Sequence, residues 1–204
     1  MEKNVEKFLA KLASSAPTPG GGGAAALTGA LGIALGNMVG NLTLGKKKYA
    51  GVQEDIAALN QRAEAIRADF VALIDADAEA FAPLSRAYGI PKDDPSRAEV
   101  METALKRAAE PPLAIMRKCA EALELVKEYA AKGSALAISD AGCAAVLIRS
   151  AAEAAALNVF INTKSMTNRK TAGRLNTEAN SLVMHCNLVA GEIYDAVYGR
   201  LADG

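Results

Sequence analysis

Tryptophan is absent from the sequence, histidine occurs once, and only 4% of the residues are aromatic. A single histidine and the lack of a C-x-x-C pair argue against a zinc site. The 23 basic and 23 acidic residues balance, so no overall basic field is present to hold nucleic acid or an anionic membrane. Cys119, Cys143 and Cys186 are odd in number, which predicts reduced, buried thiols in a cytoplasmic protein.

Long apolar runs are also scarce. The first twelve residues, MEKNVEKFLAKL, carry charges every few positions and lack the apolar stretch of a signal peptide. We identify one segment long enough to cross a bilayer, residues 24–44. Because it contains Asn37, Asn41 and two threonines, we interpret it as a buried core helix and expect no membrane partner.

Strand signals are nearly absent, whereas helical spacing recurs along the whole chain. We therefore predict an all-α fold, a multi-helical single domain (1–204) with long packed helices. The N-terminal helix should end at the Pro-Gly-rich segment 16–23, and Pro111 and Pro112 should separate two helices. Helix starts are predicted at Asp94, and at Ser139 or Asp140. The expected helices after the first one are 24–44, 52–88, 94–109, 111–133, 139–165 and 170–202.

Glycines recur at every fourth position of segment 24–44, at Gly32, Gly36 and Gly40. Each costs about 1 kcal/mol relative to alanine in a helix interior. This pattern indicates that either another helix or a ligand approaches the backbone closely on that face.

Asp77 is the most informative single residue. The third predicted helix carries an apolar stripe in strict 4-3 spacing, and the stripe continues through Asp77 to Phe81 and Leu84. A carboxylate on such a stripe is costly unless it is paired or faces a polar pocket. Asp77 is therefore either a structural ion-pair partner or a catalytic acid or base. The apolar positions before it are Val52, Ile56, Leu59, Ala63, Ile66, Phe70 and Leu73.

Three further groups can bind a ligand. Glycines before an apolar helix expose backbone N–H groups that favour negative charge, although flexible loops look the same. Three lysines at a helix end can hold an anion or simply be solvated. Two asparagines four apart on one helix face can read a heterocycle or cross-link helices. These groups are Gly20, Gly21, Gly22 and Gly23; Lys46, Lys47 and Lys48; and Asn158 and Asn162.

Two other motifs carry less weight. Residues 40–47 nearly match a phosphate-binding loop, but Lys47 stands where the magnesium-binding hydroxyl belongs and no strand precedes the glycines. We reject a nucleotide site for this reason. His185 lies one position off the apolar stripe of its helix, and we interpret it as structural.

Three blocks together, APTPGGGGAAALTGALGIALGNMVGNLTLGKKKY, DADAEAF and ISDAGCAAVLIRSAAEAAALNVFINTKS, resemble the cyclodeaminase/cyclohydrolase family of folate enzymes. The resemblance implies an all-α homodimer without metal or prosthetic group, and a pocket for a tetrahydrofolate derivative near the glycine-rich turn. It places the family's D-x-x-A-F aspartate on Asp77, its S-D-x-G cap on Ser139, Asp140 and Gly142, and its amides on Asn158 and Asn162. The glycine turn falls on residues 20–23 and the basic cluster on residues 46–48.

The resemblance also implies the chemistry. The first expectation is interconversion of 5,10-methenyltetrahydrofolate and 10-formyltetrahydrofolate, with Asp77 taking a proton from water. The alternative is cyclodeamination of 5-formiminotetrahydrofolate with release of ammonia. Because no formiminotransferase domain is present in this sequence, we do not expect a bifunctional enzyme. A third hypothesis is a helical scaffold or folate-binding protein without activity.

Overall fold

The computed structural model describes residues 2–202, and within them the chain forms helices and no strand. The all-α prediction is confirmed. The elements are α1 (Glu2–Leu12), α2 (Gly21–Asn41), the 3-10 segment η1 (Lys47–Val52), α3 (Gln53–Ala87), α4 (Arg97–Lys132), the 3-10 segment η2 (Ala135–Ala137), α5 (Ile138–Lys164) and α6 (Arg169–Ala202).

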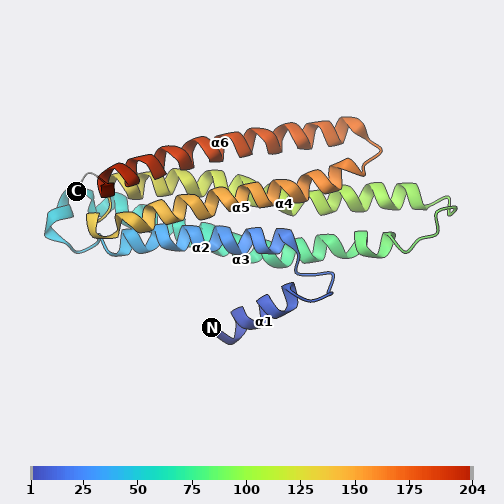
Figure 1. Cartoon of the computed structure of the whole chain (residues 1–204), viewed down its shortest axis with the longest axis horizontal. Helices are drawn as coiled ribbons and strands as arrows, with labels where there is room; N and C mark the ends of the chain where they lie inside the picture. The colour runs from blue at the N-terminus through green and yellow to red at the C-terminus, as the bar shows by residue number, and fades with distance from the viewer. Residues whose placement is uncertain (1, 203–204) are drawn as a thin grey trace.

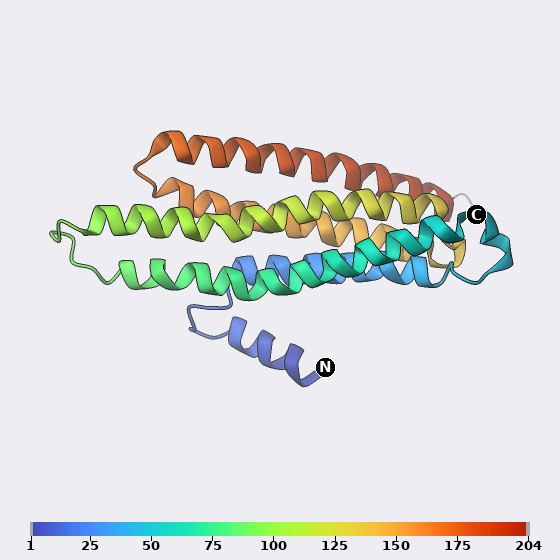
Figure 2. The ribbon, with the colours of Figure 1, turned by 180° about the vertical axis from the view of Figure 1, so that it is seen from behind.

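Helices α2 to α6 form an elongated bundle in which each helix runs opposite to the one before it (Figure 1). The short connections between them favour this up-and-down order. Helices α4 and α5 are the central elements: α5 packs against α2, α4 and α6, and α4 also packs against α2, α3 and α6. Seen from behind, α3 and α4 lie side by side and extend past the beginning of α2 (Figure 2). Helix α1 stands apart from the bundle, and its apolar residues Val5 and Leu9 are exposed.

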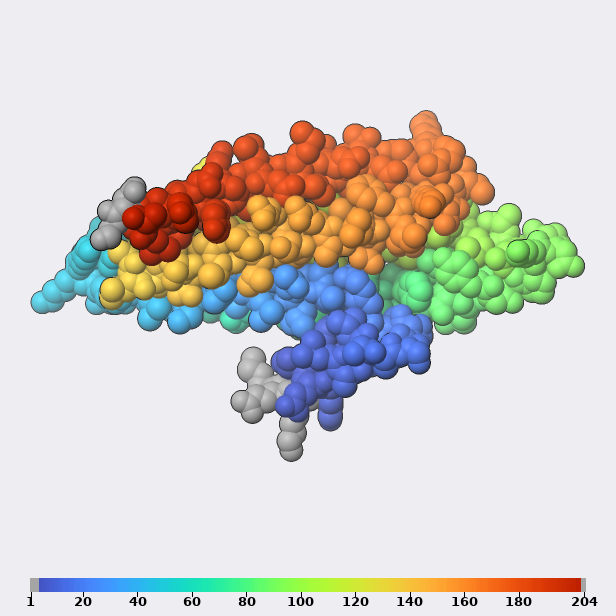
Figure 3. Space-filling model, in the orientation of Figure 1, coloured from blue at the N-terminus to red at the C-terminus, as the bar shows by residue number. Residues whose placement is uncertain are grey.

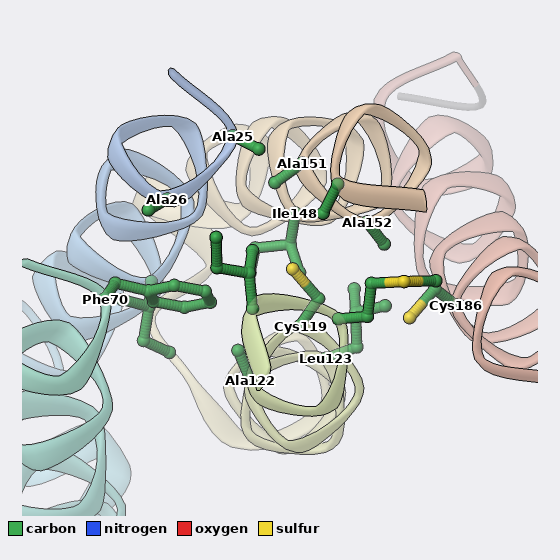
Figure 4. Close-up of a cluster of buried hydrophobic side chains, with 14 of the residues drawn as sticks. Ala25, Ala26, Phe70, Cys119, Ala122, Leu123, Ile148, Ala151, Ala152 and Cys186 are labelled. Carbon is green, nitrogen blue, oxygen red and sulfur yellow. The ribbon is translucent and has the colours of Figure 1, made fainter. Parts of the chain in front are cut away.

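The core is made largely of small residues, which lets the helices pack closely. Figure 4 shows Ala25 and Ala26 of α2 facing Ile148 and Ala151 of α5, with Phe70 of α3 filling the space beside them. The repeated glycines of α2 belong to this packing. A Cβ on Gly32 would meet Ile148, and one on Gly36 or Gly40 would meet Tyr129 of α4. The structure therefore confirms that other helices, not a ligand, approach the glycine repeat of α2 closely.

Helix α4 corrects the prediction of two helices separated at residue 110. It runs unbroken through the buried Pro111 and Pro112. Pro112 has no N–H to donate to the carbonyl of Ala108 four residues earlier. Asn162 of α5 supplies the missing donor, because its Nδ2 lies 3.1 Å from that carbonyl oxygen. A side chain 54 positions away in the sequence thus supports the helix across the proline pair.

Three predicted helix starts are also displaced. Asp94 accepts hydrogen bonds from the backbone N–H and hydroxyl of Ser96 in a turn, and α4 begins only at Arg97. Ser139 and Asp140 lie inside the first turn of α5, after the N-cap Ala137. The segment 21–23, predicted as a turn, is the first turn of α2. Local capping preferences therefore did not specify these boundaries to the residue.

Two smaller predictions are wrong. Two helices of the described chain, Gly21–Asn41 and Ala135–Lys164, are long and apolar enough to cross a membrane by length and composition, not one. Cys143 is exposed, whereas Cys119 and Cys186 are buried in the core between α4, α5 and α6 as predicted.

Candidate functional site

The carboxylate of Asp77 lies against the first turn of α2. Its Oδ2 accepts a hydrogen bond from the backbone N–H of Gly23 at 3.1 Å. None of the salt bridges formed within residues 2–202 includes Asp77. The carboxylate is therefore not neutralised by a described cation. Because the side chain is half-buried, it also remains in contact with solvent. Of the two interpretations of this residue, the structural ion pair is excluded for the described residues.

Glycine is required where α2 meets these side chains. A Cβ on Gly22 would overlap the carboxylate of Asp77, and one on Gly21 would lie 2.9 Å from Nδ2 of Asn158. The absence of side chains therefore lets α3 and α5 bring a carboxylate and an amide onto the start of α2. We call Gly21–Gly23, Asp77 and Asn158 the Asp77 corner. Figure 3 shows a recess between the start of α2, α5 and α3.

Electrostatics at the Asp77 corner work in two directions. Burial raises the pKa of Asp77 above its ordinary value, and the hydrogen bond from Gly23 opposes this rise. The N-terminus of α2 also favours a negative charge at this position. The result is a carboxylate that keeps its place at a helix end while holding a proton more readily than a solvated aspartate. These are the properties of a group that can exchange protons with a substrate.

The two asparagines of α5 have separate surroundings. Asn158 faces the Asp77 corner, and its Nδ2 donates to the carbonyl of Ala154 at 2.9 Å. Asn162 is buried, and its Nδ2 donates to the carbonyls of Ala108 and Asn158. The cross-linking role that the sequence left open therefore belongs to Asn162, whereas Asn158 lies beside Gly21 at the Asp77 corner.

The predicted basic cluster lies at the other end of the bundle. Helix α2 has 21 residues and, at about 1.5 Å per residue, separates the Asp77 corner from Lys46 by about 30 Å. The Nζ of Lys46 lies 3.3 Å from the hydroxyl of Ser134, just before η2. Ser139 and Asp140 follow at the start of α5, so they share this end. We call Lys46–Lys48, Ser139 and Asp140 the lysine end.

An apolar groove opens at the lysine end between α5 and α6. Its volume is about 450 Å³, and Ser139, Gly142, Cys143, Leu147 and Tyr198 are among its lining residues. Cys143 lies 15 residues before Asn158 on α5, or about 22 Å along the helix. This groove is therefore separate from the Asp77 corner, and within one chain the predicted site residues form two groups.

His185, the single histidine, lies outside both groups. The Nε2 of His185 lies 3.4 Å from the carboxylate of Glu124, on the surface between α6 and α4. No group of three or more metal-binding side chains occurs among the residues that the structure describes. Sequence reasoning missed Ile74, which lies against Gly23 together with Pro19 of the predicted Pro-Gly-rich segment. The sequence pattern gave no signal for Ile74, because it reads as an ordinary apolar residue of α3.

The all-helical architecture agrees with the comparisons to known proteins. The family model described as formiminotransferase-cyclodeaminase matches residues 4–181. The chain belongs to this family. A methenyltetrahydrofolate cyclohydrolase of Methylorubrum extorquens is 41% identical, and the match covers 98% of both chains. This family member has nearly the same length as the present chain.

Two further similar proteins are longer or more distant in sequence. A formimidoyltransferase-cyclodeaminase of Sus scrofa is 30% identical over 99% of this chain, which spans 38% of that protein. The crystal structure of a formiminotetrahydrofolate cyclodeaminase from Thermotoga maritima superposes with a TM-score of 0.85 at 27% identity, over 98% of this chain and 96% of that one.

Proposed function

We propose that this protein is a methenyltetrahydrofolate cyclohydrolase that interconverts 5,10-methenyltetrahydrofolate and 10-formyltetrahydrofolate. The observation that carries the proposal is the half-buried carboxylate of Asp77, held by the N–H of Gly23 and without a cation partner among the described residues. The substrate is itself a cation at the carbon to be attacked, so it supplies the positive charge that Asp77 lacks. The full-length similarity to the Methylorubrum extorquens cyclohydrolase supports the same reaction.

In the proposed mechanism, Asp77 first stabilises the cationic carbon between N5 and N10. A water molecule then attacks that carbon, and Asp77 takes the water's proton as the C–O bond forms. The hydroxyl proton moves to N5 as the C–N5 bond breaks, which leaves the formyl group on N10. Asp77 finally releases its proton to solvent. The raised pKa of Asp77 brings its proton affinity closer to what this exchange needs.

Asn158 and the first turn of α2 orient the pterin in this proposal. The Oδ1 and Nδ2 atoms of Asn158 lie over Gly21, so the amide is placed beside the carboxylate. The free N–H groups at the start of a helix are hydrogen-bond donors for ligand oxygen atoms. Lys46–Lys48, at the opposite end of the bundle, supply positive charge for the negatively charged glutamate tail. In this proposal the tetrahydrofolate derivative binds as the substrate. We propose neither a prosthetic group nor a metal.

Cyclodeamination of 5-formiminotetrahydrofolate is the second candidate, because the similar Thermotoga maritima structure carries that activity in its name. In that reaction an acid protonates the departing amine, whereas hydrolysis needs a base for water. The 41% identity to a cyclohydrolase of equal length favours the first reaction.

Two assays at equal protein concentration decide between these reactions. The first follows the loss of methenyltetrahydrofolate absorbance with and without the protein, and the second follows ammonia release from the formimino substrate. Faster absorbance loss without ammonia release supports the cyclohydrolase. Ammonia release without loss of methenyltetrahydrofolate would assign the deaminase reaction. If the protein shows neither activity, the hypothesis of a scaffold without activity is supported.

We further propose that the protein is a cytoplasmic homodimer. Its odd number of cysteines, two of them buried and unpaired, suits a reducing compartment. Several large apolar side chains are exposed on α2, α5 and α6, which supports association with a second copy.

A further inference from the structure

The two groups of candidate binding residues are too far apart for one small ligand. The Asp77 corner and the lysine end are separated by the full length of α2, about 30 Å. Both contain residues that the sequence motifs single out. A site that needs both therefore requires a second chain.

A continuous uncharged surface joins the two groups. Helix α2 contains no charged residue between Gly21 and Asn41, and its outward side chains include Leu31 and Met38. On α5, the outward stripe follows the 4-3 spacing and is also uncharged. Helices α2 and α5 lie side by side in Figure 3, so the two stripes form one face. The members of the α5 stripe are Cys143, Leu147, Ser150, Ala154, Leu157 and Ile161.

The size of this surface suits a stable dimer. Helix α5 has 27 residues and is about 40 Å long, and two packed helices are about 20 Å wide, which gives about 800 Å² per copy. Stable interfaces bury about 800 Å² per partner. Leu157 and Ile161 are 68% and 62% exposed in the single chain, so the face gains free energy when it is covered.

The positions of the two groups select one dimer geometry. A two-fold axis perpendicular to the helices makes the partner's α2 and α5 run antiparallel to their own copies. The midpoint between the two groups lies near Leu35 on α2 and Val146 on α5, as judged from the contacts of Gly21 with Asn158 and of Lys46 with Ser134. An axis through that point brings the lysine end of each copy to the Asp77 corner of the other.

We propose that the folate site is composite: Asp77 and Asn158 of one copy act with Lys46–Lys48 of a second copy, which bind the glutamate tail. The positive charges of one chain then face the helix start and carboxylate of the other. This inference rests on the proposed function for the identity of the ligand.

Mixing two defective variants tests the composite site directly. Asp77→Asn removes the carboxylate, and the triple change Lys46→Gln, Lys47→Gln and Lys48→Gln removes the cations. After subunit exchange, half of the dimers are mixed, and one of the two sites in each mixed dimer has both groups intact. At substrate far below KM, we expect about a quarter of wild-type activity from the mixture. If each site uses its own chain, the mixture shows only the average of the two variants, which overturns the proposal.

Cross-linking tests the geometry without any assay of activity. Leu136 is 91% exposed at the lysine end, and Leu157 lies 21 positions later on α5 at the Asp77 corner. In a Cys143→Ser background, we expect Leu136→Cys chains to form disulfides with Leu157→Cys chains of a different tag. A Leu136–Leu136 product indicates parallel helices and overturns the proposal. Leu147→Cys chains, one residue from the axis, are the matched control and should cross-link to themselves.

Light scattering completes the test. We expect twice the chain mass of 21.1 kDa, and a charged substitution, Leu31→Asp, should produce monomers with an intact circular dichroism spectrum. A fully active monomer contradicts the composite site. If the wild-type protein has no folate activity, the proposed function fails, while dimer mass and cross-links still decide whether the antiparallel assembly exists.

Discussion

The two ends of the bundle hold charges in opposite ways. At the Asp77 corner a single carboxylate is half-buried, fixed by one backbone N–H and surrounded by glycine, proline and isoleucine. At the lysine end Lys47 and Lys48 are exposed, and Lys48 rests over the ring of Tyr49. The buried charge pays a desolvation cost and stays in one position, whereas the exposed charges are solvated and mobile. The first arrangement suits proton transfer, and the second suits attraction of an anion.

The largest difference should appear when Asp77 is changed to asparagine. A general base contributes about 10²–10⁴-fold, so we expect turnover to fall within that range. The fold should survive, because Asn Oδ1 can still accept the hydrogen bond from Gly23. Steady-state hydrolysis of methenyltetrahydrofolate measures the effect. The matched control is Asp75→Asn, two residues away and exposed, which should retain wild-type activity. Equal activity of both variants would remove Asp77 from the chemistry.

The same substitution has a predictable effect on stability. Burial raises the pKa of Asp77 in the folded state, so ionisation destabilises the fold as the pH rises through that value. Asp77→Asn removes this cost. We therefore expect its melting temperature to equal or exceed that of the wild type at neutral pH, with the difference shrinking in acid. A clearly lower melting temperature at neutral pH would indicate a structural role.

Insertion of one methyl group should disturb the same corner. Gly22→Ala places a Cβ on the carboxylate of Asp77 and forces it to move. A displacement of about 1 Å costs up to about 10²-fold in rate, and we expect a loss of that order in kcat/KM. Gly173→Ala is the control, because an added Cβ there meets no atom within 4 Å. Kinetics of both variants, with circular dichroism, separate a site effect from unfolding.

The pH dependence of activity should report the buried carboxylate. The base form is required, so kcat/KM should fall by about tenfold per pH unit below the pKa of Asp77. Because burial raises this pKa, the acidic limb should lie above the usual aspartate range. Asp77→Asn should lack the limb. A wild-type profile that is flat from pH 4 to 8 would contradict the assignment.

The two asparagines of α5 should separate into binding and stability. Asn162→Ala leaves the carbonyl of Ala108 without its donor, which should lower the unfolding free energy by about 1–3 kcal/mol with little change in KM. Asn158→Ala should instead raise KM by roughly twofold to tenfold. Urea unfolding and substrate titration of both variants provide the comparison. Similar effects of the two changes on both quantities would be inconsistent with this division.

The smallest effect should come from single lysines. Lys47→Gln removes one exposed charge, and we expect KM to rise about twofold to fivefold at low salt. Because mobile ions screen exposed charges, the difference should vanish at about 0.5 M salt. Lys92→Gln, a change in the loop between α3 and α4, is the control. A salt-independent change in KM would mean that Lys47 does not act through long-range attraction.

Helix periodicity made most of the fold readable from the sequence. The 4-3 spacing of Ile56, Leu59, Ala63 and Ile66 predicted α3 within one or two residues, and it also isolated Asp77 as the polar member of an apolar stripe. A local pattern works here because helix burial depends on neighbours three and four positions away. The sequence did not predict that α4 continues through its two prolines. The hydrogen bond that replaces the missing proline N–H comes from Asn162 of another helix.

The sequence by itself therefore determined the helical class, the core faces and the identity of the acidic residue. Only the tertiary structure decided which candidates meet. It brought Gly22, Asp77 and Asn158 together from three helices, and it placed Lys46 at the far end of α2. The physical reason is that periodicity specifies which face of a helix is buried, while the distance between two residues depends on helix lengths and on which helices pack together.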